Sequence, residues 1–127
     1  MRSFLISIAL LLVVSALWCN FDLYSDAALT DFNDTIHSET LPFVESEDWP
    51  AAVSSFSDQR ENWETYRRRA AFFLGTGDLN EISEEMAKTA RYIKAQDVSN
   101  ASGELACLAD MLLFLHQNES ATPANIL

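Results

Sequence analysis

The chain has 127 residues, a formal net charge of −11 and 49% hydrophobic residues. Only 8 residues are Lys or Arg against 19 that are Asp or Glu, which argues against a nucleic-acid-binding protein, because phosphate contacts need basic side chains. The same imbalance argues against docking on an anionic membrane surface.

The first segment is a long uncharged stretch, "MRSFLISIALLLVVSALWCNFD". No charged residue lies between Arg2 and Asp22, and a run of this length is at the short edge of what crosses a bilayer core of roughly 30 Å. Trp18 near its end suits the headgroup layer, where indole rings gather. Residues 1–21 are therefore predicted to be an uncleaved transmembrane anchor, with Arg2 and Trp18 at the two membrane interfaces.

Two processed forms are alternatives to the anchor. Signal cleavage needs small residues at positions −1 and −3, and "SAL", "ALW" and "LWC" all fail at one or both. Lipidation of Cys19 would need a small residue before it, where Trp18 stands. A cleaved secretory signal and a lipidated Cys19 are therefore weaker hypotheses than the uncleaved anchor.

Charge predicts the orientation of the anchor. Arg2 is the only basic residue before Arg60, and the basic side of a span stays in the cytoplasm. We expect a single-pass protein of the cell membrane, with a cytoplasmic N-terminus and an extracytoplasmic helical domain.

Residues 22–45 are predicted to be an acidic helical extension and linker. Leu29, Phe32 and Ile36 are spaced three and four apart, which indicates an amphipathic helix. Pro42 is expected to end this helix, because proline disfavours helical geometry in the residue before it.

Residues 46–118 are predicted to form three further helices. The first has Ser46 as its cap, Pro50 in its first turn and the Gly75 and Gly77 turn at its end. The second begins at Asp78, and Asp97 caps the third, whose apolar residues repeat at three and four. With a tail at 119–127, the expected fold is all-α: an N-terminal transmembrane helix followed by a small antiparallel three-helix bundle.

An aromatic stripe and an apolar helix end are the candidate interaction face. Trp49, Phe56 and Trp63 recur every seven residues, which is typical of a core seam and is also compatible with an exposed groove for a partner helix. Leu113 and Phe114 widen the apolar face of the last helix.

The sequence offers no motif for catalysis or for a cofactor. His37 and His116 lack a second ligand at metal-binding spacing, and Cys19 and Cys107 are too few for a disulfide framework, although one bond between them is an option. No pair stands out among the 19 acids, so an envelope hydrolase using two carboxylates is only a weak alternative. We expect no cofactor, no metal and no enzymatic activity.

Two other patterns, the basic run and the glycosylation motifs, can be explained without a function. The basic run at residues 67–69 lies one helical turn after Glu64, which indicates a solvated helix face with ion pairs. Acceptor motifs for glycosylation at Asn33, Asn100 and Asn118 are close to what chance would give.

Several short motifs occur in a recognisable order: "EDWPAA" with Trp49, then Trp63, "DLNEI", "YIKAQD", "GELACL", His116 and the terminal "NIL". In this order and spacing the chain resembles a bacterial family known as domain of unknown function 4363. The resemblance implies a mostly helical, single-span protein without an assigned activity, often encoded beside a small multi-span membrane protein. Family members tend to have a His where this chain has Thr76 and Gly77.

These observations lead to two expectations of function. The first is a membrane-anchored extracytoplasmic helical module that serves a membrane or envelope protein partner. The second is a secreted helical binding protein, released by signal cleavage. The sequence does not set the oligomeric state.

Overall fold

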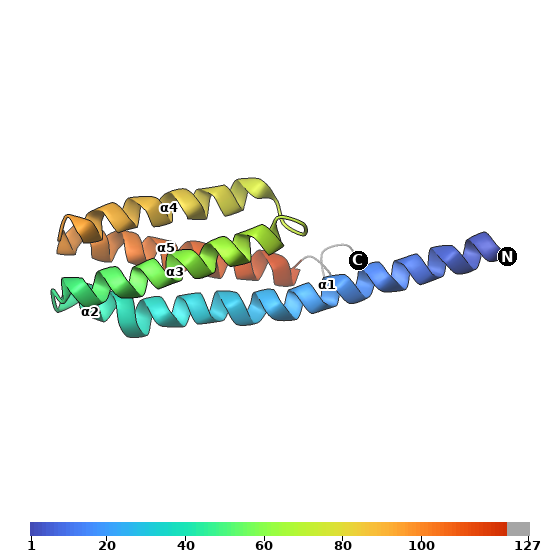
Figure 1. Ribbon diagram of the computed structural model, residues 1–127, viewed down its shortest axis with the longest axis horizontal. Coiled ribbons are helices and arrows are strands. Elements are labelled where there is room, and N and C mark those ends of the chain that lie inside the picture. Colours follow the sequence, from blue (N-terminus) through green and yellow to red (C-terminus); the bar gives the residue numbers. More distant parts are fainter. Residues whose placement is uncertain (122–127) are drawn as a thin grey trace.

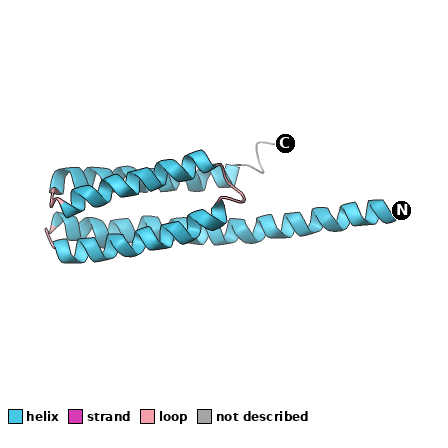
Figure 2. Ribbon diagram, turned by 45° about the horizontal axis from the view of Figure 1, so that its top comes forward, coloured by secondary structure: helices cyan, strands magenta, loops and turns pink. Residues whose placement is uncertain are grey.

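The structure is a computed structural model that describes residues 1–121, and all its elements there are helical (Figures 1 and 2). In chain order they are α1 (Arg2–Thr35), a π-helical turn η1 (Ile36–Thr40), α2 (Leu41–Glu45), α3 (Trp49–Ala70), α4 (Thr76–Lys94) and α5 (Val98–Ala121). No strand occurs in these residues, so the prediction of an all-α fold is confirmed for the described part of the chain.

The long helices share one body, and α1 also extends far beyond it (Figure 1). Helix α4 packs against α3 and α5, and α1 packs against α5 and α3. The connection between α3 and α4 lies at the end of the body from which α1 projects, whereas the α2–α3 and α4–α5 connections lie at the other end (Figures 1 and 2).

The second half of α1 is part of the hydrophobic core. Phe21, Leu29 and Phe32 of α1, and Ile36 at the start of η1, are at most 6% exposed and belong to the same buried cluster as the inner faces of α3, α4 and α5. Burying each such side chain contributes about 1.5–3 kcal/mol, so this half of α1 is bound firmly to the body. The amphipathic spacing predicts this helix correctly, but the predicted bundle of three helices omits α1, which also packs on α3 and α5.

The prediction that Pro42 ends the first helix is wrong. The chain stays helical from Arg2 to Glu45, over 44 residues, and Pro42 lies in the first turn of α2. A proline ring inside an α-helix clashes with the carbonyl four residues earlier. Here the wider π-helical turn η1 directly precedes α2, and the Leu41 N–H bonds to the Ile36 carbonyl, five residues back. The helix therefore passes the proline by changing its hydrogen-bond register.

The connection from α2 to α3 is set by a left-handed residue. Glu47 has φ 58°, which lets the Asp48 N–H bond to the Phe43 carbonyl at 2.9 Å and closes the end of α2. Asp48 then caps α3 by accepting from the Ala51 N–H at 3.3 Å. The predicted cap, Ser46, lies two residues too early.

The same turn recurs before α5. Gln96 has φ 57°, and the Asp97 N–H bonds to the Tyr92 carbonyl at 3.1 Å. Asp97 Oδ1 accepts from the Asn100 N–H at 3.1 Å, which confirms Asp97 as the predicted cap. Helix α5 runs on to Ala121, past the predicted end at 118, and the terminal "NIL" lies outside the described residues.

The α3–α4 connection differs from the prediction at both ends. Helix α3 ends at Ala70 and not at the glycines, because residues 71–75 leave the helix and Phe73 stacks on Phe21. Helix α4 begins at Thr76 after an extended Gly75, so Asp78 lies inside its first turn and is not its cap.

Candidate functional site

The first half of α1 has no packing partner along most of its length. Its large apolar side chains are exposed, as for Phe4 (68%), Leu11 (65%) and Leu17 (55%). Within residues 1–121, two helices are long and apolar enough to cross a membrane: Arg2–Glu45, whose most apolar window is 6% buried, and Val98–Asn118, whose window is 33% buried. The second is explained by its buried leucine seam, so the bare half of α1 is the stronger candidate span.

An aromatic cluster stands where the bare half of α1 meets the body. The Phe73 ring stacks on Phe21, with centroids 4.3 Å apart, and meets Trp18 edge-on at 5.8 Å. The guanidinium of Arg69 lies 5.1 Å from the centre of the Tyr24 ring. Trp18, one of the two predicted interface residues, is therefore half-buried by the α3–α4 connection, whereas Arg2 is exposed at the far end.

Polar contacts fix α1 against α3. A buried hydrogen bond joins the hydroxyls of Ser25 and Tyr66 at 2.6 Å. Further along, the Thr40 hydroxyl contacts the Ser55 hydroxyl at 2.8 Å and accepts from the Gln59 amide. A buried polar group without a hydrogen-bond partner destabilises the fold. Rotation of α1 about its axis would break these pairs, so they favour a single orientation of α1 against α3.

A second set of polar contacts fixes α1 against α5. The Asn33 side-chain amide donates to the Ala109 carbonyl at 3.0 Å, and His116 Nε2 lies 3.1 Å from Asp26 Oδ1. Asn33 is thus engaged in the helix interface, which argues against its use as a glycosylation acceptor. Together with the contacts to α3, these contacts join α1 to the body from two sides.

A groove of about 800 Å³ lies between α3 and α4. Its floor is apolar and includes Phe56, Trp63 and Met86. Arg60, Arg68 and Lys94 line it together with Glu61 and Glu64, so its lining carries three cations against two acids.

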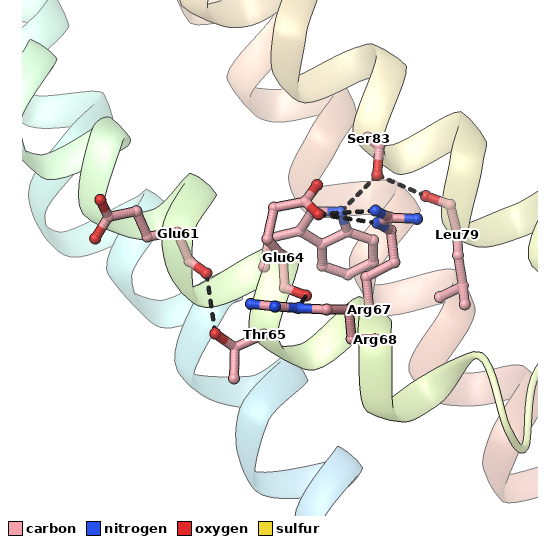
Figure 3. A network of polar contacts seen from close by, with 8 residues as sticks. Glu61, Glu64, Thr65, Arg67, Arg68, Leu79 and Ser83 are labelled. Atoms are coloured by element: carbon pink, nitrogen blue, oxygen red, sulfur yellow. Dashed lines mark hydrogen bonds and ion pairs between the residues drawn. The ribbon is translucent and has the colours of Figure 1, made fainter.

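One wall of this groove is held by a short polar network (Figure 3). The Trp63 indole N–H donates to the Ser83 hydroxyl at 2.8 Å, and Ser83 donates to the Leu79 carbonyl at 3.1 Å. Glu64 accepts from Arg67 at 2.8 Å, as the helical spacing predicts, and this bond raises the pKa of Arg67 above its usual value.

The structure divides the predicted interaction face into two parts. Phe56 and Trp63 are 2% and 1% exposed, so the stripe is mainly core, and Trp49 is half-buried. Leu113 and Phe114 are 47% and 62% exposed on α5, away from the groove that Phe56 and Trp63 line. The two parts do not form one surface.

The structure brings together two carboxylates, one on α4 and one on α5, that the sequence analysis did not predict as a pair. The Lys88 ammonium lies 3.2 Å from Glu85 and 3.2 Å from Glu104. Burial and a hydrogen bond with Glu104 raise the pKa of Glu85, whereas the bonds from Glu85 and Lys88 lower the pKa of Glu104. The pairing joins residues 19 positions apart on different helices, which no local spacing could reveal.

Glu85 and Glu104 also form, with Cys107, the one cluster of potential metal ligands in the described residues, all within 4.8 Å. The Lys88 ammonium already supplies the positive charge between the two carboxylates. Burial raises the pKa of the Cys107 thiol, which disfavours the thiolate that a metal needs. The arrangement reads as an ion-pair network joining α4 to α5.

The two histidines lie apart from the carboxylate cluster, and the two cysteines are not bonded to each other. His37 is exposed on η1, and His116 contacts Asp26, so neither belongs to the carboxylate cluster. Cys19 and Cys107 are both free thiols.

Comparison with known proteins gives one finding. No curated protein and no solved structure matches the chain. A family model described as "Domain of unknown function (DUF4363)" matches residues 24–126, from the core half of α1 through α5. The match covers most of the chain, and it is the family that the sequence resembles: this protein belongs to the DUF4363 family.

Proposed function

We propose that this protein is a membrane-anchored accessory module that holds a partner-binding groove at a fixed height and orientation on the extracytoplasmic side of the membrane. One observation carries the proposal: a single helix is bare and apolar over its first half and is built into the core over its second half. A flexible tether would only limit how far the body can diffuse. A continuous helix also sets how the body faces the bilayer.

The scaffold is an antiparallel bundle in which the second half of α1 serves as the fourth helix. This arrangement is supported by the short α3–α4 and α4–α5 connections and by the packing of α1 on both α3 and α5. The orientation follows from Arg2, the only basic residue before Arg60, which favours a cytoplasmic N-terminus.

The groove between α3 and α4 is the proposed docking site. A protein partner would place an amphipathic helix there, with apolar residues against the exposed Val53 and acidic residues beside Arg60 and Lys94. The rest of the surface is strongly acidic, so this basic edge selects an acidic segment by charge. The partner is a protein of the membrane or envelope, because the anchor confines the groove to that layer.

Photo-crosslinking in intact cells tests this proposal. A photoreactive phenylalanine at Val53, which is 49% exposed and lines the groove, should give a discrete crosslinked protein. The same group at Phe114 reports on the α5 face, and at Ser99 on the far end of the body. Crosslinks from Phe114 alone, or from none of these positions, would overturn the groove as the docking site.

Charge reversal gives a matched control for that experiment. Arg60→Glu should reduce the crosslink at Val53 several-fold, because it removes a cation from the groove. Arg91→Glu makes the same charge change at an exposed position outside the groove and should leave the crosslink unchanged.

A further inference from the structure

Phe72 is a large apolar side chain that is almost fully exposed on the body. It lies in the α3–α4 connection, and its side chain is 88% exposed, more than any other large hydrophobic residue among the described residues except Met1. A phenylalanine left in water forgoes about 1.5–3 kcal/mol that burial would contribute. Its neighbour Phe73 is partly buried against the core, so the connection presents one ring inward and one outward.

The contacts of Phe73 define the height of this connection along α1. Phe73 touches both Trp18 and Phe21, which stand at the end of the uncharged run that closes at Asp22. The connection also lies at the end of the body from which α1 projects (Figure 1). If residues 1–21 span the bilayer, Phe72 is level with the headgroup layer, where aromatic side chains are favoured.

The charges near this end fit a lipid surface. Residues 70–77 contain no acid, and Arg68 and Arg69 are exposed in the turn of α3 that leads into them. Long arginine side chains can extend along apolar surface and place their guanidinium groups beside lipid phosphates. The remaining body is acidic, so an anionic membrane would repel the rest of it, and the contact is confined to this end.

From these observations we infer that the α3–α4 connection is a second membrane contact, in which Phe72 enters the headgroup layer of the leaflet that the body faces and Arg68 and Arg69 contact lipid phosphates. The inference rests on the proposed membrane anchor. It gives the body two attachment points, the span and the connection, and so limits its tilt relative to the bilayer.

Site-specific fluorescence in vesicles tests the contact. The full-length chain, with Cys19→Ser and Cys107→Ser, is labelled with an environment-sensitive dye at one introduced cysteine and reconstituted in phosphatidylcholine vesicles. The label at Phe72→Cys should be quenched by lipids carrying a nitroxide near the headgroup. It should also be several-fold less accessible to aqueous iodide than a label at Ser99→Cys, which lies at the opposite end of the body and reports its orientation.

A label at Leu10→Cys separates this inference from the proposed anchor. Lipid quenching at Leu10 together with full iodide access at Phe72 would overturn the second contact and leave the anchor standing. Iodide access at both positions would overturn both.

A second measurement keeps the phenylalanine in place, because a dye can itself enter a membrane. With the label at Thr76→Cys, an exposed position just beyond the connection, Phe72→Asp should raise iodide quenching about two-fold, whereas Phe72→Trp should not change it. Equal quenching in all three backgrounds would show that Phe72 does not hold the connection at the lipid surface.

Discussion

The hydroxyl of Tyr66 on α3 lies 2.6 Å from the hydroxyl of Ser25 on α1, and both residues are at most 1% exposed. A buried hydrogen bond between these two helices means that α1 cannot rotate or slide without leaving polar atoms in an apolar core. The helix that is proposed to cross the membrane is therefore held in register with the body.

This contact predicts a measurable coupling. In a double-mutant cycle of Ser25→Ala and Tyr66→Phe, the coupling free energy should be about 0.5–1.5 kcal/mol, because the two hydroxyls stabilise each other. Urea unfolding of the full chain in detergent, followed by near-ultraviolet circular dichroism, measures it. Ser54→Ala on the exposed side of α3 should cost nothing, and a coupling near zero would show that the hydroxyls act independently.

The two left-handed residues predict stabilising substitutions. A residue with a Cβ costs roughly 1–2 kcal/mol in this conformation. Glu47→Gly and Gln96→Gly should therefore each raise the free energy of unfolding by about 0.5–1 kcal/mol, after the flexibility cost of glycine. Glu47→Ala keeps the Cβ and should give no gain, so a gain of equal size with alanine would refute the backbone explanation.

Trp63 and Phe114 should respond in opposite ways to truncation. Trp63 is 1% exposed and bonded to Ser83, so Trp63→Ala should cost about 3–5 kcal/mol of folding stability. Phe114 is 62% exposed, and Phe114→Ala should change stability by less than about 0.5 kcal/mol. Thermal unfolding of both variants decides this. A stable Trp63→Ala variant would contradict its place in the core.

The carboxylate pair predicts a pH effect with a definite sign. The folded-state pKa of Glu85 is raised above its value of 4.5 in the unfolded chain, chiefly by burial, so the folded state holds this proton more tightly. Stability from this group is present below the unfolded pKa and is lost as pH rises through the folded one. Glu85→Gln should therefore gain stability over the parent as pH rises from about 4 to 7.

Melting temperatures across that pH range check the Glu85 prediction. Glu84→Gln removes the same charge from an exposed neighbouring position and should show a flat difference from the parent. The pKa of Glu104 is lowered, so its contribution runs the other way, and Glu104→Gln should lose stability as pH rises. A pH-independent gain for Glu85→Gln would show that ionisation is not the cause.

Local patterns in the sequence predicted local structure well. The spacing of Leu29, Phe32 and Ile36 indicated a helix, Pro50 indicated a first turn, and Asp97 indicated a cap, and all three hold. Each of these signals depends on neighbours within about one helical turn, so no tertiary information is needed.

What the sequence could not predict depends on contacts between helices. That Leu29 and Phe32 face α3 and α5, and not a separate partner, follows only from how α1 packs. Pro42 predicts a helix end from local rules, and the compensating π-helical turn has no local signature in the sequence. Likewise, Glu85 meets Glu104, and Phe73 meets Trp18, only after the helices are brought together.

One uncleaved helix is proposed both to span the membrane and to belong to the core of the body. The most direct test is the intact mass of the protein recovered from washed membranes and from the medium. We expect the unprocessed 14.2-kDa chain in the membranes alone. A lighter product in the medium, beginning near Cys19, would contradict the anchor and indicate a secreted helical protein. A heavier membrane product beginning at Cys19 would indicate a lipid anchor instead.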